Sequence, residues 1–83
     1  MKVKVRVKFF SVHREVVGKK ELEIELREKT SINEVLKLLI TDYPKIRKLM
    51  DSTIISLNHN NANGSELLKD GDEVALFPPV GGG

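Results

Sequence analysis

The sequence predicts an α+β fold in which one main helix packs on one face of a mixed sheet. Apolar and charged residues alternate at residues 2–9 and 21–27, which is the period of a strand with one buried face. Residues 32–43 instead carry apolar side chains at helical spacing. Two segments rich in β-branched or apolar residues, at 53–57 and 73–77, then predict further strands after that helix.

The first two predicted strands carry opposite charges on their polar faces. The first strand is basic at Lys2, Lys4, Arg6 and Lys8 and apolar at Val3, Val5, Val7 and Phe9, and the second is acidic at Glu21, Glu23 and Glu25. Antiparallel pairing would place opposite charges across from each other, worth about 0.2–1 kcal/mol for each good pair. The joining residues 11–20 are too many for a tight turn, so we expect a helical turn at 12–17 that stops at Gly18.

The main helix has recognisable ends. Ser31 followed by Glu34 is a capping-box pattern, in which the two side chains satisfy backbone amides of the first helical turn. Pro44 disfavours helical geometry at Tyr43 and therefore ends the helix there. The apolar residues at 46–50 predict a short second helical piece.

The second half of the chain completes the sheet. Residues 53–57 predict a buried strand, and the turn-rich residues 58–64 leave room for a very short one. Asp70-Gly71 is a tight-turn signal that precedes the last strand at 73–77.

This order of elements (strand, strand, helix, strand, short strand, strand) is that of the β-grasp architecture, with four to five strands and one main helix. We expect the first and last strands to lie side by side and parallel in the middle of the sheet, because both are rich in Val, Phe or Leu. Residues 1–80 would form this single domain, and residues 81–83 a flexible C-terminal glycine tail.

Composition argues against several kinds of chemistry. The absence of cysteine excludes a disulfide scaffold, a cysteine nucleophile and a thiolate metal site. His13 and His59 lie in polar contexts without ligand spacing, so we interpret both as surface residues and expect no metal site. Glu21, Glu23 and Glu25 are interpreted as a solvated strand face rather than an acid–base pair.

Net charge and hydropathy limit the kinds of partner that this chain is expected to bind. Fourteen basic against twelve acidic residues give a net charge of only +2, and the basic strand faces an acidic one, so we do not expect nucleic-acid binding. No apolar run approaches the roughly 20 residues of a membrane-spanning helix. We therefore expect a soluble cytoplasmic protein with no membrane partner.

The C-terminus is the main compositional anomaly. Three of the six glycines and two of the three prolines fall in the last six residues, 78–83. A frayed end is the simplest interpretation of such a tail. However, the tail follows directly from a predicted core strand, and Pro78 and Pro79 stiffen its exit. An extended arm that ends in residues without side chains can thread a narrow channel in another protein.

The reactive group of such an arm would be the α-carboxylate of Gly83. A free α-carboxylate has a pKa of about 3.3–3.7, so it is ionised at neutral pH and is a poor electrophile. It needs activation, for instance as an acyl-adenylate, and nothing in this chain predicts an ATP site. The hypothesis that follows is a carrier with no bound cofactor, whose catalysis and ATP use belong to its partners.

Two segments resemble the MoaD family, the small subunit of molybdopterin synthase. Residues 70–80, Asp-Gly-Asp-Glu-Val-Ala-Leu-Phe-Pro-Pro-Val, followed by terminal glycines, follow that family's ending. Residues 9–18 follow its pattern of two Phe, three variable residues, Arg-Glu, two apolar residues and Gly. The resemblance covers the whole chain and implies a ubiquitin-like β-grasp sulfur carrier.

The resemblance also implies partners and site residues. A ubiquitin-activating-like adenylyltransferase would adenylate Gly83 with ATP, and a sulfur donor enzyme would convert it to a thiocarboxylate, with Gly82-Gly83 as the functional pair. The tail, which is Pro78, Pro79, Val80 and Gly81, would enter the large synthase subunit in a heterotetramer. The sulfur would pass to cyclic pyranopterin monophosphate. Gly81 departs from the family, whose members often carry a larger residue such as Thr there.

Strand alternation places a candidate partner interface beside the tail. If Val74 and Leu76 face the core, then Ala75 and Phe77 face outward, and Phe10 does so on the neighbouring strand. Phe10, Ala75 and Phe77 would form an exposed apolar patch, and such patches usually mark binding surfaces. The alternative is that Phe77 turns inward at the sheet edge.

Other functions stay open from the sequence. The chain could carry sulfur to another acceptor, such as tRNA or thiazole, or be a protein modifier joined to lysines. It could also be a plain β-grasp binding module with an inert tail.

Overall fold

The computed structural model describes residues 2–79, which form a five-stranded sheet and a helical layer. The elements, in chain order, are β1 (Lys2–Phe9), α1 (Val12–Val17), β2 (Glu21–Arg27), α2 (Ile32–Asp42), the 3₁₀ helix η1 (Pro44–Ile46), α3 (Arg47–Met50), β3 (Ile54–Leu57), β4 (Asn60–Ala62) and β5 (Glu73–Phe77). This order confirms the predicted arrangement of elements, including the short strand β4.

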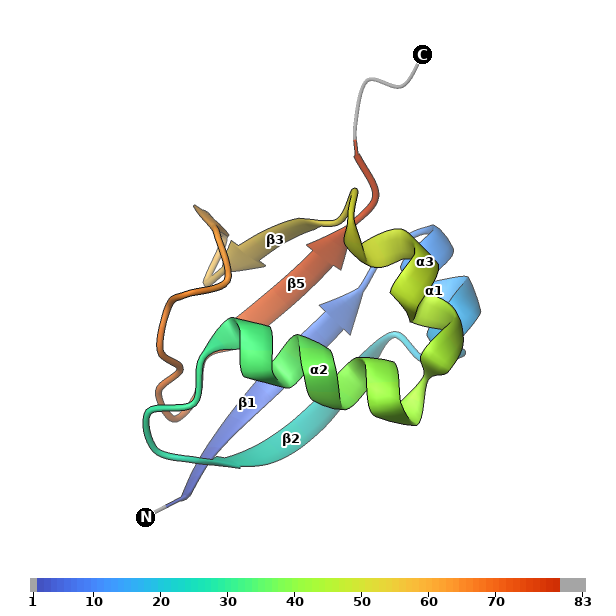
Figure 1. Cartoon of the computed structure of the whole chain (residues 1–83). Helices are drawn as coiled ribbons and strands as arrows, with labels where there is room; N and C mark the ends of the chain where they lie inside the picture. The colour runs from blue at the N-terminus through green and yellow to red at the C-terminus, as the bar shows by residue number, and fades with distance from the viewer. Residues whose placement is uncertain (1, 80–83) are drawn as a thin grey trace.

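The sheet has the strand order β2-β1-β5-β3-β4. β1 and β5 run parallel in the middle, and the other neighbours are antiparallel. α2 crosses one face of this sheet, as Figure 1 shows, and the opposite face has no helix over it. The α+β class and the parallel central pair are therefore confirmed.

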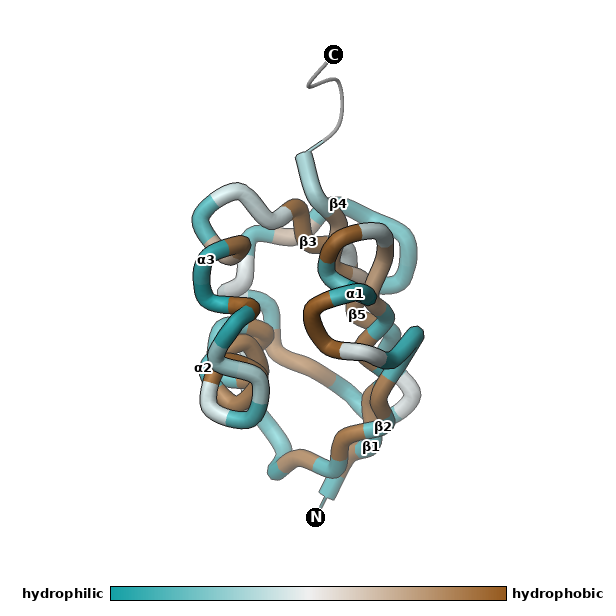
Figure 2. The backbone as a smooth tube through the Cα atoms, turned by 90° about the vertical axis from the view of Figure 1, so that its right-hand side faces the viewer, coloured by the Kyte–Doolittle hydropathy of each residue, from teal (hydrophilic) through white to brown (hydrophobic). Residues whose placement is uncertain are grey.

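The core fills the space between the sheet and the helical layer, which Figure 2 shows edge-on. The valines of β1 and Phe9 point into it, and so do Ile32, Val35 and Leu39 of α2 and Val74 and Leu76 of β5. These positions follow the period of two in the strands and the spacing of three and four in the helix. The sequence pattern therefore identified the buried face of each main element.

The charges of β1 and β2 pair largely as expected. Lys4 lies opposite Glu25, Arg6 opposite Glu23, and Lys8 opposite Glu21. Lys2 lies opposite Arg27 instead, and its Nζ reaches diagonally to a Glu25 oxygen at 3.3 Å. These side chains are mostly exposed, so each pair adds little stability, and the alternation mainly fixes the register of the hairpin.

Both helix boundaries predicted around α2 are confirmed. The Ser31 Oγ accepts a hydrogen bond from the Glu34 amide at 3.3 Å, and the Glu34 carboxylate accepts one from the Ser31 amide at 2.8 Å. α2 ends at Asp42, with Tyr43 as the cap residue before Pro44. The predicted turn of helix at 12–17 also forms, and Gly18 ends it in the left-handed conformation.

The prediction that β3 is a fully buried strand is wrong. All four of its residues are half-buried. Ile55 and Leu57 pack against the core, whereas Ile54 and Ser56 lie opposite Phe77 and Ala75 and face away from α2. β3 is exposed on that side because no second layer covers the open face of the sheet.

The interpretation of His13 as a surface residue is also wrong, because only 1% of it is exposed. α1 places His13 and Val17 one turn apart, so both face inward. The His13 Nε2 lies 2.8 Å from the Thr53 Oγ1, and burial lowers the pKa of the imidazole. His59, in contrast, is exposed as expected.

The capping box should contribute measurably to stability. Replacing Ser31 with Ala removes the side-chain acceptor for the Glu34 amide, and we expect the free energy of unfolding to fall by about 1 kcal/mol. Chemical denaturation followed by circular dichroism measures it. Ser11→Ala is the matched control, because Ser11 precedes α1 without a side-chain cap bond. Equal losses in the two variants would contradict a specific cap contribution.

Burial of His13 predicts a loss of stability in mild acid. Its folded-state pKa lies below the unfolded value of about 6.5, so the unfolded chain takes up the proton first. The stability that neutral His13 provides is complete above that value and decreases as pH falls toward the folded pKa. The loss is measured by chemical denaturation of the wild type and of His13→Gln at several pH values between about 8 and about 5, the range in which imidazole titrates. Parallel curves for the two proteins would contradict it.

Candidate functional site

The root of the C-terminal tail is built by the central strand β5. β5 pairs with β1 on one side and with β3 on the other, so Leu76 is held from both sides and Phe77, the last residue, pairs with Ile54 of β3. Pro78 is half-buried and Pro79 exposed, and the chain leaves the sheet there (Figure 1). The predicted tail residues Val80, Gly81, Gly82 and Gly83 lie outside the described residues.

An aromatic pair lies directly at this root. The rings of Phe10 and Phe77 stack with their centroids 4.7 Å apart and their planes 10° apart. Both side chains are half-buried, and neither belongs to the core cluster. Parallel pairing of β1 with β5 brings their ends to the same edge, and the Phe10 amide donates to the Leu76 carbonyl at 3.3 Å. Phe77 therefore does not turn into the core.

Ala75 does not join this surface as an exposed residue, so that part of the predicted patch is wrong. Only 5% of Ala75 is exposed, although it lies outside the core cluster. Its register neighbours are Lys8 on β1 and Ser56 on β3. Because the short Ala75 side chain lies between these two neighbours on a central strand, little of it is exposed.

The sequence interpretation missed Ile54. This half-buried residue lies opposite Phe77 in the β3–β5 ladder, so the two side chains are on the same face of the sheet. Phe10, Ile54 and Phe77 together are called the tail-root patch below. The signal was present in residues 54–57, where Ile54 and Ser56 alternate with Ile55 and Leu57, but residues 53–57 were interpreted as a buried strand.

A charged cluster adjoins the tail-root patch on the open face. The carboxylate of Glu73, with 14% of its side chain exposed, lies 3.3 Å from the Lys8 Nζ and 3.8 Å from an Arg6 Nη. The imidazole of the exposed His59 is 3.6 Å from the same carboxylate. On the same face, Glu21 and Glu23 lie opposite Lys8 and Arg6 in the β1–β2 ladder, so these charges largely compensate one another.

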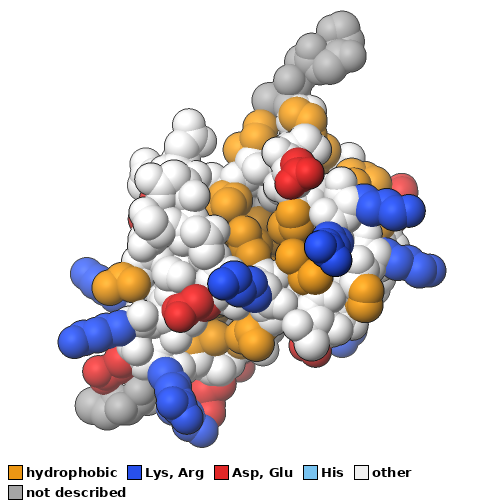
Figure 3. Space-filling view, viewed as in Figure 1, with side chains coloured by type: hydrophobic (Ala, Val, Ile, Leu, Met, Phe, Trp, Pro, Cys, Tyr) orange, Lys and Arg blue, Asp and Glu red, His pale blue; other side chains and the backbone are white. Residues whose placement is uncertain are grey.

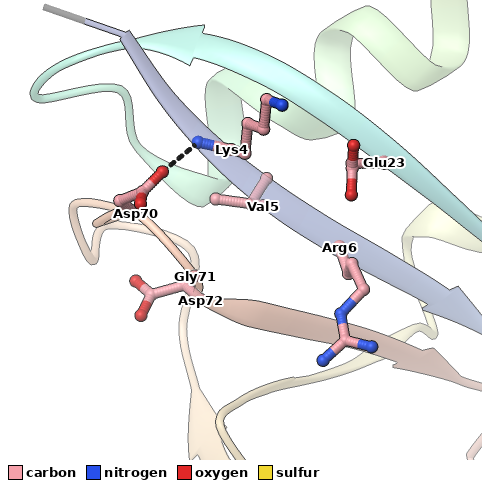
Figure 4. Close-up of a pocket in the computed structure, with 7 residues that line it drawn as sticks. All are labelled: Lys4, Val5, Arg6, Glu23, Asp70, Gly71 and Asp72. Atoms are coloured by element: carbon pink, nitrogen blue, oxygen red, sulfur yellow. Dashed lines mark hydrogen bonds between the residues drawn. The ribbon is translucent and has the colours of Figure 1, made fainter.

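The polar hollow drawn in Figure 4 lies at the other end of β1 and β5. Its carboxylates hold the backbone: an Asp70 oxygen accepts from the Lys4 amide at 2.8 Å, and an Asp72 oxygen accepts from the Lys69 amide at 2.7 Å. The Gly71 amide in turn donates to the Lys4 carbonyl at 2.7 Å. These groups tie the turn before β5 to β1, as expected for Asp beside a turn glycine.

A second hollow opens on the helix-bearing face, where Figure 3 shows apolar side chains gathered near the centre. Leu36 and Ile40 of α2 line it together with Met50 and Ile55. All four pack against the core cluster as its partly buried margin. This hollow therefore lies where the hydrophobic core reaches the surface between α2 and β3.

Residues 2–79 contain neither a cluster of metal-ligating side chains nor a helix that could span a membrane. In that part of the chain, no three side chains of His, Cys, Asp or Glu come close enough together to hold a metal ion. None of the helices formed by these residues has the length and apolar character needed to cross a membrane.

The sequence of this chain is similar to those of two named proteins. The molybdopterin synthase sulfur carrier subunit of Chlamydomonas reinhardtii is 34% identical over 83 residues, which cover 98% of this chain and 100% of that protein. The small archaeal modifier protein 3 of Haloferax volcanii is 30% identical over 92 residues, which cover 98% of this chain and 100% of that protein.

Solved structures agree with the fold. The putative molybdopterin converting factor, subunit 1, from Pyrococcus furiosus has a TM-score of 0.86 at 34% identity, covering 94% of this chain and 99% of that one. A chain from the complex of subunits 1 and 2 of molybdopterin-converting factor from Helicobacter pylori has a TM-score of 0.70 at 27% identity, covering 98% of this chain and all of that one.

The family model described as ThiS family matches residues 7–83, which include the whole of the tail, all of β5 and the end of β1. This match and the relatives that are at least 30% identical over their full length establish the family. The chain belongs to the ThiS family.

Proposed function

We propose that this chain is a sulfur carrier and serves as the small subunit of a molybdopterin synthase. The observation that carries the proposal is the tail root, where a strand held in the middle of the sheet leads into Pro78-Pro79 beside an accessible aromatic pair. The sulfur carrier relatives align over their whole length with this arrangement. The sequence then ends in three glycines, which supply a terminal carboxylate on an arm without side chains.

The proposed chemistry takes place at the α-carboxylate of Gly83. A carboxylate oxygen attacks the α-phosphorus of ATP, which is bound by the activating enzyme, and pyrophosphate leaves to give an acyl-adenylate. The outer sulfur of a persulfide on the sulfur donor enzyme then attacks the acyl carbon, and AMP leaves to give an acyl disulfide. A thiol attacks the donor's sulfur in that disulfide, so that the donor leaves in a new disulfide with the thiol and the thiocarboxylate remains on Gly83. Because the chain has no cysteine, the sulfur it carries has to reside on its own terminus.

The large synthase subunit is the proposed recipient of the charged tail. The tail-root patch offers two aromatic anchors next to the tail, and buried aromatic anchors commonly provide most of the binding energy of an interface. The complex of the Helicobacter pylori relative supports a partner of this kind.

Activation of Gly83 provides the direct test. The purified chain is incubated with a ubiquitin-activating-like adenylyltransferase, ATP and a sulfur donor enzyme, and its intact mass is measured. We expect a mass increase equal to the replacement of one oxygen by sulfur, localised to Gly83 by fragmentation. A chain lacking Gly83 should fold normally, because the core cluster is formed by residues 3–76, but should acquire no sulfur.

Other outcomes of this experiment distinguish the remaining functions. Covalent attachment to lysines of other proteins, without sulfur transfer to a pterin, would identify a protein modifier, as the name of the Haloferax volcanii relative suggests for that protein. Neither adenylate nor thiocarboxylate would identify an inert tail and refute the proposal.

Binding to the large subunit should depend on the tail-root patch. Phe77→Asp places a charge in the aromatic pair, and we expect the dissociation constant to rise at least about thirtyfold, the size of a hot-spot loss. Isothermal titration calorimetry with the large subunit of the same organism measures it.

Leu38→Asp is the matched control for this variant. Leu38 is 48% exposed on α2, so it offers an apolar side chain of similar size away from the patch. Its substitution should leave the affinity unchanged. If Phe77→Asp binds as tightly as Leu38→Asp, while circular dichroism shows both to be folded, the patch is not the interface.

A further inference from the structure

A buried hydrogen bond joins two segments that meet behind the tail-root patch. The His13 Nε2 on α1 lies 2.8 Å from the Thr53 Oγ1, which immediately precedes β3. The two residues are 40 positions apart in the chain, so this contact is tertiary rather than local. It is also buried on the His13 side, where only 1% of the residue is exposed.

Donor and acceptor roles in this contact follow from its neighbours. The Thr53 hydroxyl donates its single proton to the Leu49 carbonyl, so it accepts from His13. The Nε2 of His13 therefore carries the proton, and the Nδ1 carries the lone pair. That Nδ1 is buried and has no hydrogen-bond partner among the described residues. Thr53 thus connects α1 to both the end of α3 and the start of β3.

Both ends of this bond are fixed to members of the tail-root patch. On one side, the His13 amide donates to the Phe10 carbonyl at 3.1 Å, and the Phe10 amide donates to the Leu76 carbonyl. On the other side, Thr53 is followed by Ile54, which lies opposite Phe77. The His13–Thr53 bond therefore closes a ring of contacts around the stacked pair.

The histidine is costly to keep in this position. A buried imidazole nitrogen without a partner loses its hydration, and buried polar side-chain atoms are usually hydrogen-bonded. An apolar side chain at the same place would avoid this cost. The hydrogen bond to Thr53 is what His13 provides and an apolar residue would not.

We propose that His13 is a positioning residue, which holds Phe10 and Phe77 in their docking arrangement by binding Thr53 across the gap between α1 and β3. The proposal rests on the proposed function insofar as the stack is the docking surface for the large subunit. The positioning itself concerns only this chain and is independent of any partner.

The test uses pairs of variants that remove or keep the bond. Thr53→Val replaces the hydroxyl with a methyl group of similar size, and Thr53→Ser keeps the hydroxyl. His13→Leu removes the nitrogen donor, and His13→Gln keeps an N–H donor that does not titrate. Val3→Ala is the control for general destabilisation, because Val3 is a core residue at the far end of β1 from the tail.

The first measurement is made on the free chain. Nuclear Overhauser contacts between the ring protons of Phe10 and Phe77 report the stack directly. We expect Thr53→Val and His13→Leu to lose or weaken these contacts while their amide spectra stay dispersed. Thr53→Ser, His13→Gln and Val3→Ala should retain them.

The second measurement is the affinity for the large synthase subunit. We expect the dissociation constant to rise about 3- to 30-fold for Thr53→Val and His13→Leu, the range that coupled positions outside an interface produce. The conservative variants should bind like the wild type. Val3→Ala should also bind like the wild type when the measurement is made at a temperature low enough for this less stable variant to be folded.

Three results would overturn the proposal. One is an unchanged stack and affinity in Thr53→Val. Another is an equal loss of affinity in Val3→Ala, which would show a merely structural role. The third is loss of the ring contacts in Thr53→Ser as well as in Thr53→Val. If His13→Leu fails to fold, the two Thr53 variants decide the question. If the wild type does not bind the large subunit, the proposed function fails, and the ring contacts alone decide the role of His13.

Discussion

The parallel pairing of β1 with β5 is the interaction on which the rest of the structure depends. It joins the two ends of the chain in the middle of the sheet, with Val7 beside Val74 and Phe9 beside Leu76. Because the strands are parallel, both finish at the same edge, so Phe10 and Phe77 stack where the tail leaves. The pairing is long-range, and its entropic cost is met by burying the apolar faces of both strands under α2.

Features fixed by neighbours in sequence could be predicted, and features fixed by neighbours in space could not. Alternation and the capping box are local patterns, so the strands β1, β2 and β5 and the start of α2 were predicted correctly. The low exposure of Ala75 depends instead on its neighbours Lys8 and Ser56 on the two adjacent strands. His13 illustrates the same limit, because its burial requires α1 to pack inward against Thr53.

The residues of the candidate site also differ in whether local sequence patterns could predict them. The sequence pointed to Phe10 and Phe77 because strand alternation alone excludes them from the core. Ile54 joins them only through the register of β3 with β5, which no single segment specifies. The ion cluster around Glu73 likewise requires β1, β5 and the turn after β3 to come together. A sequence therefore predicts which strands form such a surface more readily than it predicts which residues the surface contains.

In this chain, the residues proposed to bind the partner are different from the terminal group proposed to react. This separation suits a carrier. Docking energy comes from side chains on a rigid sheet, which lose little conformational freedom when a partner binds. The reacting carboxylate belongs to a terminal glycine, and an arm that ends in residues without side chains can enter a narrow channel. A carrier has to leave its activating enzyme before it reaches the acceptor, so its contacts have to be limited. A patch of three half-buried apolar residues meets that requirement better than an extended apolar face would.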